Sequence, residues 1–126
     1  MSIKIFFLAI ALFTAFNKDN SNKVQKKQFI YTLRYNNEYK ANLQFGAKEQ
    51  TAAREHVAYL RELLSEGNCY MAGRTPNIID TSLFGIIVFD AANLDAAKEI
   101  MNNDPMIKEN IMVGELRPFT IVLFKQ

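Results

Sequence analysis

The chain has 126 residues, a length that suits one domain with a single hydrophobic core. Hydrophobic residues make up 49% of it and charged residues 22%, with only 5 Gly and 3 Pro, which excludes a disordered or low-complexity protein. The formal net charge is +2, from 15 Lys and Arg against 13 Asp and Glu, so we expect no nucleic acid partner.

The amino-terminal segment differs from the rest of the chain and predicts export. Residues 1–17 carry one lysine, then an apolar run from Ile5 to Phe13, then small and polar residues, which is the layout of a secretory signal peptide. The apolar run is well short of the ~20 residues that span a bilayer, so we expect no stable membrane span. No small-x-small pair marks a cleavage site, and an uncleaved anchor therefore remains the alternative. Cleavage would place the protein outside the cytoplasm, in the periplasm or secreted.

Residues 18–27 have the polar, charged composition of a solvated linker, and the folded domain is predicted over residues 28–126. The domain contains the chain's single histidine, His56, and its single cysteine, Cys69. One cysteine cannot form an intramolecular disulfide, and one Cys with one His gives no zinc-binding spacing. We expect no metal site and no cofactor. Cys69 is predicted to be a small buried hydrophobic residue rather than a nucleophile.

The first half of the domain predicts a strand, a loop and a helix. Residues 28–35 (QFIYTLRY) alternate β-branched, aromatic and long side chains, as a strand does, and the Asn-rich residues 36–46 suit an exposed loop. Residues 47–66 predict an amphipathic helix that ends at Gly67, because glycine readily adopts the left-handed conformation that stops a helix. Its apolar residues recur at spacings of four, three and four: Ala53, Val57, Leu60 and Leu64.

The second half of the domain predicts further strands. Residues 69–75 (CYMAGRT) and 83–90 (LFGIIVFD) are predicted to be strands joined by a turn, and the apolar run of the latter is typical of a central strand. Residues 110–119 and 120–124 predict one long strand or two short ones, interrupted at Pro118.

A second helix is predicted over residues 94–103, with Asn93 as its N-cap. It ends at Asp104 and Pro105, because proline disfavours a helical conformation at the preceding residue. Asp followed by Pro is itself the signature of an N-cap and a first helical residue. A new turn of helix is therefore expected there.

The order strand, helix, strand, strand, helix, strand predicts an α+β fold. It corresponds to a ferredoxin-like βαββαβ sheet with both helices on one face, here with an extra C-terminal strand. Strands as apolar as LFGIIVF and TIVLF would leave an apolar face in water, and such a face usually marks an interface. We therefore predict a homodimer that forms through the sheets.

Several stretches, in their order along the chain, resemble a known family. They are His56 with the downstream YLRELLSEG, then MAGRT, FGIIVFD, NNDP and GELRPF. Together they resemble the YciI-like, or YCII-related, domain over nearly the whole folded region. The resemblance implies a dimeric α+β barrel. Most members of that family have no known substrate, and one branch eliminates chloride from a chlorinated hydroxyhydroquinone.

The resemblance also implies a site, in which a helix histidine pairs with the aspartate of the Asp-Pro motif. These residues are His56 and Asp104 in this chain. Periodicity alone favours a structural histidine, since His56 lies at the edge of the apolar stripe, whereas the resemblance favours a site. A histidine oriented by a carboxylate suits a general base. Asp104 could instead be a helix cap with no part in catalysis, and one carboxylate could also serve as both a cap and a partner of the histidine.

Further candidates lie on the predicted strands. Arg74 could hold a substrate carboxylate or phenolate in a bidentate geometry, or could form a surface or dimer salt bridge. Arg34 and Glu115 are candidate substrate-binding residues, with a mutual ion pair as the structural alternative. Tyr70 and Met71 are expected in the wall of the site or in the core.

Three functions remain open. The first is a cofactor-independent enzyme of lyase or isomerase type, in which His56 moves a proton on a small substrate that is anionic or aromatic. The second is a non-catalytic module that binds a small molecule in the same cleft. The third is a structural protein whose sheet serves only the dimer. The Asn-rich loop and the amino-terminal segment depart from the family pattern, so no substrate is carried over.

Overall fold

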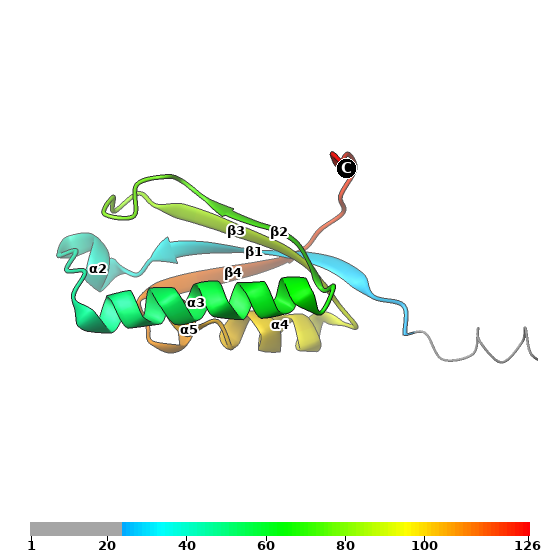
Figure 1. Cartoon of the computed structure of the whole chain (residues 1–126), viewed down its shortest axis with the longest axis horizontal. Coiled ribbons are helices and arrows are strands. Elements are labelled where there is room, and N and C mark those ends of the chain that lie inside the picture. The colour runs from blue at the N-terminus through cyan, green and yellow to red at the C-terminus, as the bar shows by residue number, and fades with distance from the viewer. Residues whose placement is uncertain (1–23) are drawn as a thin grey trace, which may run out of the picture.

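The computed structural model describes residues 24–126, which form a four-stranded antiparallel sheet with helices on one side (Figure 1). The predicted signal peptide and most of the predicted linker lie outside these residues. No helix within residues 24–126 has both the length and the apolar character that crossing a bilayer requires. The elements are β1 (Lys27–Tyr35), α2 (Asn37–Ala41), α3 (Ala47–Ser65), β2 (Cys69–Arg74), β3 (Phe84–Ala91), α4 (Leu94–Asn102), α5 (Pro105–Lys108) and β4 (Met112–Pro118).

The strand order in the sheet is β2-β3-β1-β4, with every neighbouring pair antiparallel. The first strand in sequence therefore lies at the centre, between β3 and β4, and the crossover helices α3 and α4 pack on the same side (Figure 1). This topology confirms the α+β, ferredoxin-like fold expected from the order of elements.

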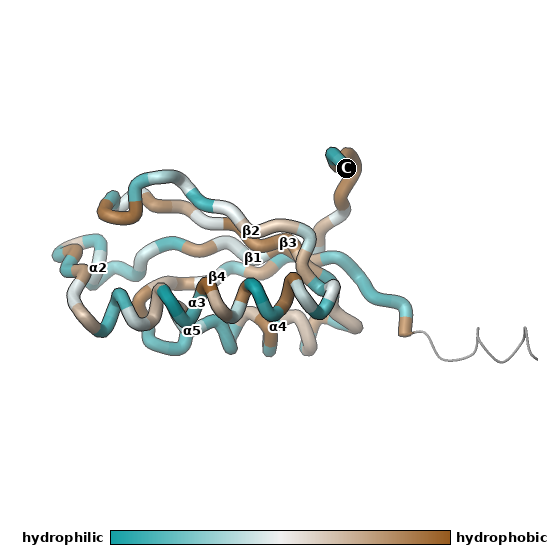
Figure 2. Tube along the Cα trace, viewed as in Figure 1, coloured by the Kyte–Doolittle hydropathy of each residue, from teal (hydrophilic) through white to brown (hydrophobic). Residues whose placement is uncertain are grey.

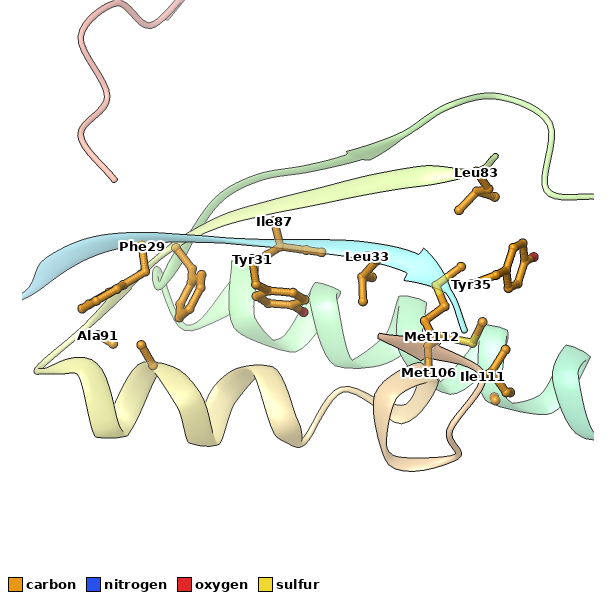
Figure 3. Packing of buried hydrophobic residues seen from close by; sticks show 13 residues of the cluster. Phe29, Tyr31, Leu33, Tyr35, Leu83, Ile87, Ala91, Met106, Ile111 and Met112 are labelled. Atoms are coloured by element: carbon orange, nitrogen blue, oxygen red, sulfur yellow. The ribbon is translucent and has the colours of Figure 1, made fainter. Parts of the chain in front are cut away.

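The hydrophobic core lies between the sheet and the helices. Every second residue of β1 from Phe29 to Tyr35 is buried, and Figure 3 shows the side chains of Phe29, Tyr31 and Leu33 directed toward the helices. The Tyr31 ring meets that of Phe89 on β3 edge-on, with ring centroids 5.6 Å apart. Burial of each such aromatic or branched side chain contributes roughly 1.5–3 kcal/mol, so β1 is the main support of the core.

The face of α3 that meets the sheet differs from the predicted stripe. Ala52 and Leu63 are buried, whereas Val57 is 44% exposed and Leu64 is 58% exposed. The alternation of polar and apolar residues along α3 is visible in Figure 2. The other two residues of the predicted stripe, Ala53 and Leu60, are half-buried against the core. The face of α3 that meets the sheet therefore overlaps the predicted stripe and extends from it to the side on which Ala52, His56 and Leu63 lie.

The predicted loop of residues 36–46 contains a short helix, α2. The Asn36 side chain caps it by accepting a hydrogen bond from the backbone N–H of Tyr39, at 3.1 Å. The Tyr39 ring stacks against Tyr35, and its hydroxyl donates to Glu49 on α3 at 2.7 Å. Asparagine is favoured both in turns and at helix N-caps. Here Asn36 caps a helix, and the packing of Tyr39 against the core stabilises that helix.

The expected C-terminal strand does not form in the described chain. β4 ends at Pro118, and no residue after it is in a strand. Two hydrogen bonds hold the start of the tail to Gln28, and beyond them Val122 and Leu123 are 85% and 92% exposed. The tail leaves the sheet on the side away from the helices (Figure 1). Pro118 lacks the N–H that would continue the hydrogen-bond ladder of β4. The strand-like composition of the residues after it is therefore not sufficient to form a further strand.

The edge strand β2 is more open than expected. Tyr70 and Met71 are exposed, and the prediction that they belong to the core or the site wall is wrong. The Tyr70 hydroxyl donates to Asp90 on the neighbouring strand at 3.0 Å. Cys69 is half-buried against the core, and this burial raises the pKa of its thiol. An edge strand has a neighbour on only one side, which explains why its side chains lack cover.

Candidate active site

His56 on α3 contacts Asp104, which lies 48 positions further along the chain. The Nδ1 atom of the ring is 2.8 Å from Oδ1 and 2.9 Å from Oδ2 of the carboxylate. The histidine side chain is 19% exposed, whereas Asp104 is fully buried. His56 reaches this carboxylate because it lies on the same face of α3 as the buried Ala52 and Leu63.

Asp104 is the only buried charged residue in the part of the chain that the structure describes. It is the N-cap of α5, and its Oδ1 accepts a hydrogen bond from the backbone N–H of Met106 at 3.0 Å. Its Oδ2 accepts the hydroxyl hydrogen of Tyr31 at 2.8 Å. A carboxylate can accept about four hydrogen bonds, so Asp104 caps the helix and contacts the histidine at the same time.

The surroundings of Asp104 determine which nitrogen of His56 carries the hydrogen. Tyr31 remains neutral, because burial and the negative charge of Asp104 raise the pKa of its hydroxyl well above the usual value. A carboxylate that faces Nδ1 favours an N–H at that atom. In a neutral ring of that tautomer, Nε2 carries the lone pair.

A cavity of about 480 Å³ opens beside His56, between α3 and the sheet. Its volume lies within the ~300–1,000 Å³ that is usual for small-molecule sites. Val57 and Leu60 line it, which explains why Val57 is exposed although it belongs to an apolar stripe. The polar side chains in its lining are mainly those of Gln50, Arg54, His56 and Arg74.

Arg74, at the end of β2, lines the same cavity as His56. Its Nη1 donates to the backbone carbonyls of Thr75 and Pro76, at 2.9 and 2.8 Å, which holds the guanidinium beside the turn. Its positive charge also acts on Tyr35: burial raises the pKa of that hydroxyl, and Arg74 offsets part of the increase. The structure therefore brings Arg74 into the same cavity as the histidine.

Arg34 and Glu115 do not reach this cavity. Both are exposed on the sheet face opposite to the helices. Glu115 forms its ion pair with Arg117, and the Arg34 guanidinium lies over the Phe84 ring, 5.3 Å from its centroid. The expected pair between Arg34 and Glu115 is therefore not formed. The hydrogen bond and charge of Arg117 lower the pKa of the Glu115 carboxyl, and the Arg34 charge adds to this effect to a smaller extent.

In residues 24–126, no group of three His, Cys, Asp or Glu side chains is arranged so that it could hold a metal ion.

The family model for the YCII-related domain matches residues 13–120. The chain belongs to the YCII-related domain family. This match covers most of the sequence and confirms the resemblance seen in its motifs. A search of curated proteins gave no match.

The fold of this YCII-related domain is similar to that of solved structures. One is 5-chloro-2-hydroxyhydroquinone dehydrochlorinase (TftG) from Burkholderia phenoliruptrix AC1100, in complex with 2,5-dihydroxybenzoquinone. The two structures have a TM-score of 0.55 and 14% sequence identity, and the match covers 74% of this chain and 93% of that chain. Another is an uncharacterized protein from Thermotoga maritima, with a TM-score of 0.48, 12% identity, and coverage of 76% of this chain and all of the other. At these identities the likeness concerns the fold alone.

Two residues of the YCII-related domain that matter here were missed at the sequence level. Tyr31 lies in a stretch with the alternation of a strand, so the sequence identifies it only as a core aromatic residue. Its hydrogen bond to Asp104 could not be predicted, because the two residues are 73 positions apart. Arg54 lies three residues before Val57 on α3, so both could have been placed on one helix face. Its position at the cavity depends on the rotation of the helix.

Proposed function

We propose that this protein is a cofactor-independent enzyme of lyase or isomerase type, which transfers a proton on a small organic substrate that is anionic or aromatic. The observation that carries the proposal is the contact between His56 Nδ1 and the buried Asp104 carboxylate, beside an open cavity. A histidine held in this way at the edge of a cavity is the arrangement that general base catalysis uses.

In this mechanism Nε2 of His56 accepts a proton from a C–H or O–H bond of the substrate, and the bonding electrons stay on the substrate. The ring becomes an imidazolium that Asp104 stabilises through Nδ1–H. In an isomerase the imidazolium returns the proton to a different atom. In a lyase the electron pair expels a leaving group instead, and the proton passes to solvent.

The structural likeness to TftG supports this reaction class, since that protein is named as a dehydrochlorinase and is bound to a quinone. A cavity of about 480 Å³ is large enough for a ring of that kind. The open cavity also argues against a purely structural role, for which the space beside His56 would be filled by side chains.

The second candidate is a non-catalytic module that binds a small molecule in the same cavity. The predominance of apolar residues in the cavity lining favours it, because such a lining supplies affinity without any chemistry. In that case His56 would only donate or accept a hydrogen bond. Binding of a ligand by the wild type without any turnover would support this candidate over the enzyme.

Two further features belong to the proposal. We infer a homodimer through the uncovered sheet face, whose apolar residues include Ile30, Ile86 and Val113. We also infer that the protein is exported, because the first residues have the layout of a signal peptide.

The enzyme proposal predicts that proton transfer depends on His56. The protein is incubated in deuterium oxide with a panel of small organic acids and hydroxyquinones, and mass spectrometry follows deuterium incorporation and elimination. His56→Gln should lower the rate by roughly 10²–10⁴-fold. Glu55→Gln is the matched control, since Glu55 is exposed on the same helix and lies outside the cavity lining. A His56→Gln protein with the wild-type rate would rule out this mechanism.

A further inference from the structure

Two arginines line the cavity from two different elements of the fold. Arg54 comes from α3 and Arg74 comes from the end of β2, and both line the cavity that His56 also lines. Both arginines are exposed, whereas His56 is largely covered. The guanidinium groups therefore lie in the outer part of the cavity and the histidine in its deeper part.

Within residues 24–126, no carboxylate neutralises this pair of charges. The cavity lining contains no Asp or Glu, and Asp104 is fully buried behind His56. The ion pairs among residues 24–126 involve neither Arg54 nor Arg74. The cavity is thus a site of net positive charge, and an anion would find complementary donors there.

The donors of both arginines are only partly used. Arg74 contacts the backbone through Nη1, which leaves Nε and Nη2 available as a fork for an anion. Arg54 makes one hydrogen bond, from an Nη atom to the Thr51 hydroxyl at 3.2 Å. Because the turn carbonyls already hold the Arg74 guanidinium, less side-chain entropy is lost when an anion binds.

The rest of the cavity is apolar. Its walls are formed by aliphatic and aromatic side chains, among them Phe45, Val57, Leu60 and Ile78. Val57 and Ile78 are exposed although they are large and apolar, and the hydrophobic tip of the loop between β2 and β3 is visible in Figure 2. Such surfaces gain free energy when a ligand covers them.

We propose that this cavity binds an organic acid with a ring-sized apolar body, whose carboxylate or phenolate lies between Arg54 and Arg74. The apolar body then contacts Val57 and Leu60, and its far end points toward Nε2 of His56. This assignment rests on the proposed function for the reaction at His56, but the anion preference itself requires no turnover. Arg54 and Arg74 are specificity-determining residues that distinguish acids from neutral compounds of the same shape.

The test compares naphthoate with its neutral isostere naphthamide. Both are titrated into the full-length protein, and NMR follows the ring signals of His56, which are unambiguous because the chain has 1 His. The wild type should bind naphthoate at least about tenfold more tightly than naphthamide. Arg54→Gln and Arg74→Gln should each remove about tenfold of the naphthoate affinity and leave naphthamide affinity unchanged.

Arg61→Gln is the matched control, because Arg61 is exposed on the same helix and lies outside the cavity lining. It causes the same change in net charge and should leave both affinities unchanged. Equal affinity for the acid and the amide would overturn the proposal, as would an Arg61→Gln protein that loses as much naphthoate affinity as Arg54→Gln. His56→Gln lacks the ring that reports binding, so its affinities and those of the wild type are compared by isothermal titration calorimetry. It should keep the preference for naphthoate over naphthamide, so a failure of catalysis and a failure of anion recognition are distinguishable.

Discussion

The Asp104 carboxylate contacts three different groups. It caps α5 through the Met106 N–H, accepts the Tyr31 hydroxyl and faces the His56 ring. Each donor offsets part of the free energy that burying the charge costs. The sequence predicted the cap and, through the family resemblance, the histidine. Tyr31 was not predicted, since nothing local distinguishes it from its neighbours on β1.

At the residue scale we predict that Tyr31 positions the Asp104 carboxylate. Tyr31→Phe removes a donor from a buried acceptor, which should lower the free energy of unfolding by about 1–3 kcal/mol. It should also lower the fraction of His56 that carries its hydrogen on Nδ1, because the carboxylate gains freedom to turn. Nitrogen chemical shifts of the one histidine measure that fraction.

Tyr59→Phe is the control for this prediction. The Tyr59 hydroxyl donates to the backbone carbonyl of Ile100 at 2.6 Å, and burial first, then the charge of Asp104, raises its pKa to about 12. Its loss should therefore reduce stability to a similar extent. The nitrogen shifts of His56 should stay at their wild-type values. If Tyr31→Phe also leaves them unchanged, Tyr31 supports only the core.

At the scale of elements, a close approach between β4 and the helices depends on Gly114. A Cβ atom at this position would lie 2.6 Å from Cδ1 of Ile107 and 2.8 Å from Sδ of Met101. These atoms belong to α5 and α4, the helices on either side of Asp104. The absence of a side chain on β4 thus lets both helices pack against the sheet.

Gly114→Ala should therefore lower the free energy of unfolding. The obstructing atoms are the ends of movable side chains, so the cost should be about 1 kcal/mol, at the low end for overpacking. Gly73→Ala is the control, because a Cβ there meets nothing within 4 Å. Alanine at that position should be neutral or slightly stabilising, since glycine loses more entropy on folding. Urea denaturation of both variants tests the difference, and equal stabilities would contradict the packing argument.

At the scale of the whole molecule, the sheet has one covered and one uncovered face. The helices cover the face that carries the core (Figure 1). The other face contains Ile30 on the central strand β1 and Val113 on the edge strand β4. Charged side chains such as Arg34 and Glu115 surround these apolar residues. Apolar centres with polar rims are typical of protein interfaces.

We predict that the wild type sediments as a dimer and that Ile30→Lys sediments as a monomer. A lysine at the centre of the interface would bury an unpaired charge twice in a symmetric dimer. Leu94→Lys is the control, because Leu94 is an exposed apolar residue on the helical side of the molecule. Circular dichroism verifies that both variants fold. A monomeric wild type would refute the homodimer.

The amino-acid sequence by itself determined the order of the four strands and of α3, α4 and α5, and the caps at Asn93 and Asp104, because these depend on neighbours within a few residues. It did not predict α2, and it predicted a C-terminal strand that does not form. The family resemblance added His56 as a candidate. The alternation along β1 also separates Arg34 from the buried side chains, which could have excluded it from the site before the fold was known.

Only the tertiary structure decided which residues meet around the cavity. Periodicity relates the directions of side chains within one helix, but it leaves open how that helix is rotated against a sheet. The orientation of α3 in the fold places Val57 in the cavity lining and His56 against Asp104. The presence of Arg54 and Arg74 at one cavity has the same origin, since it depends on how α3 packs beside β2.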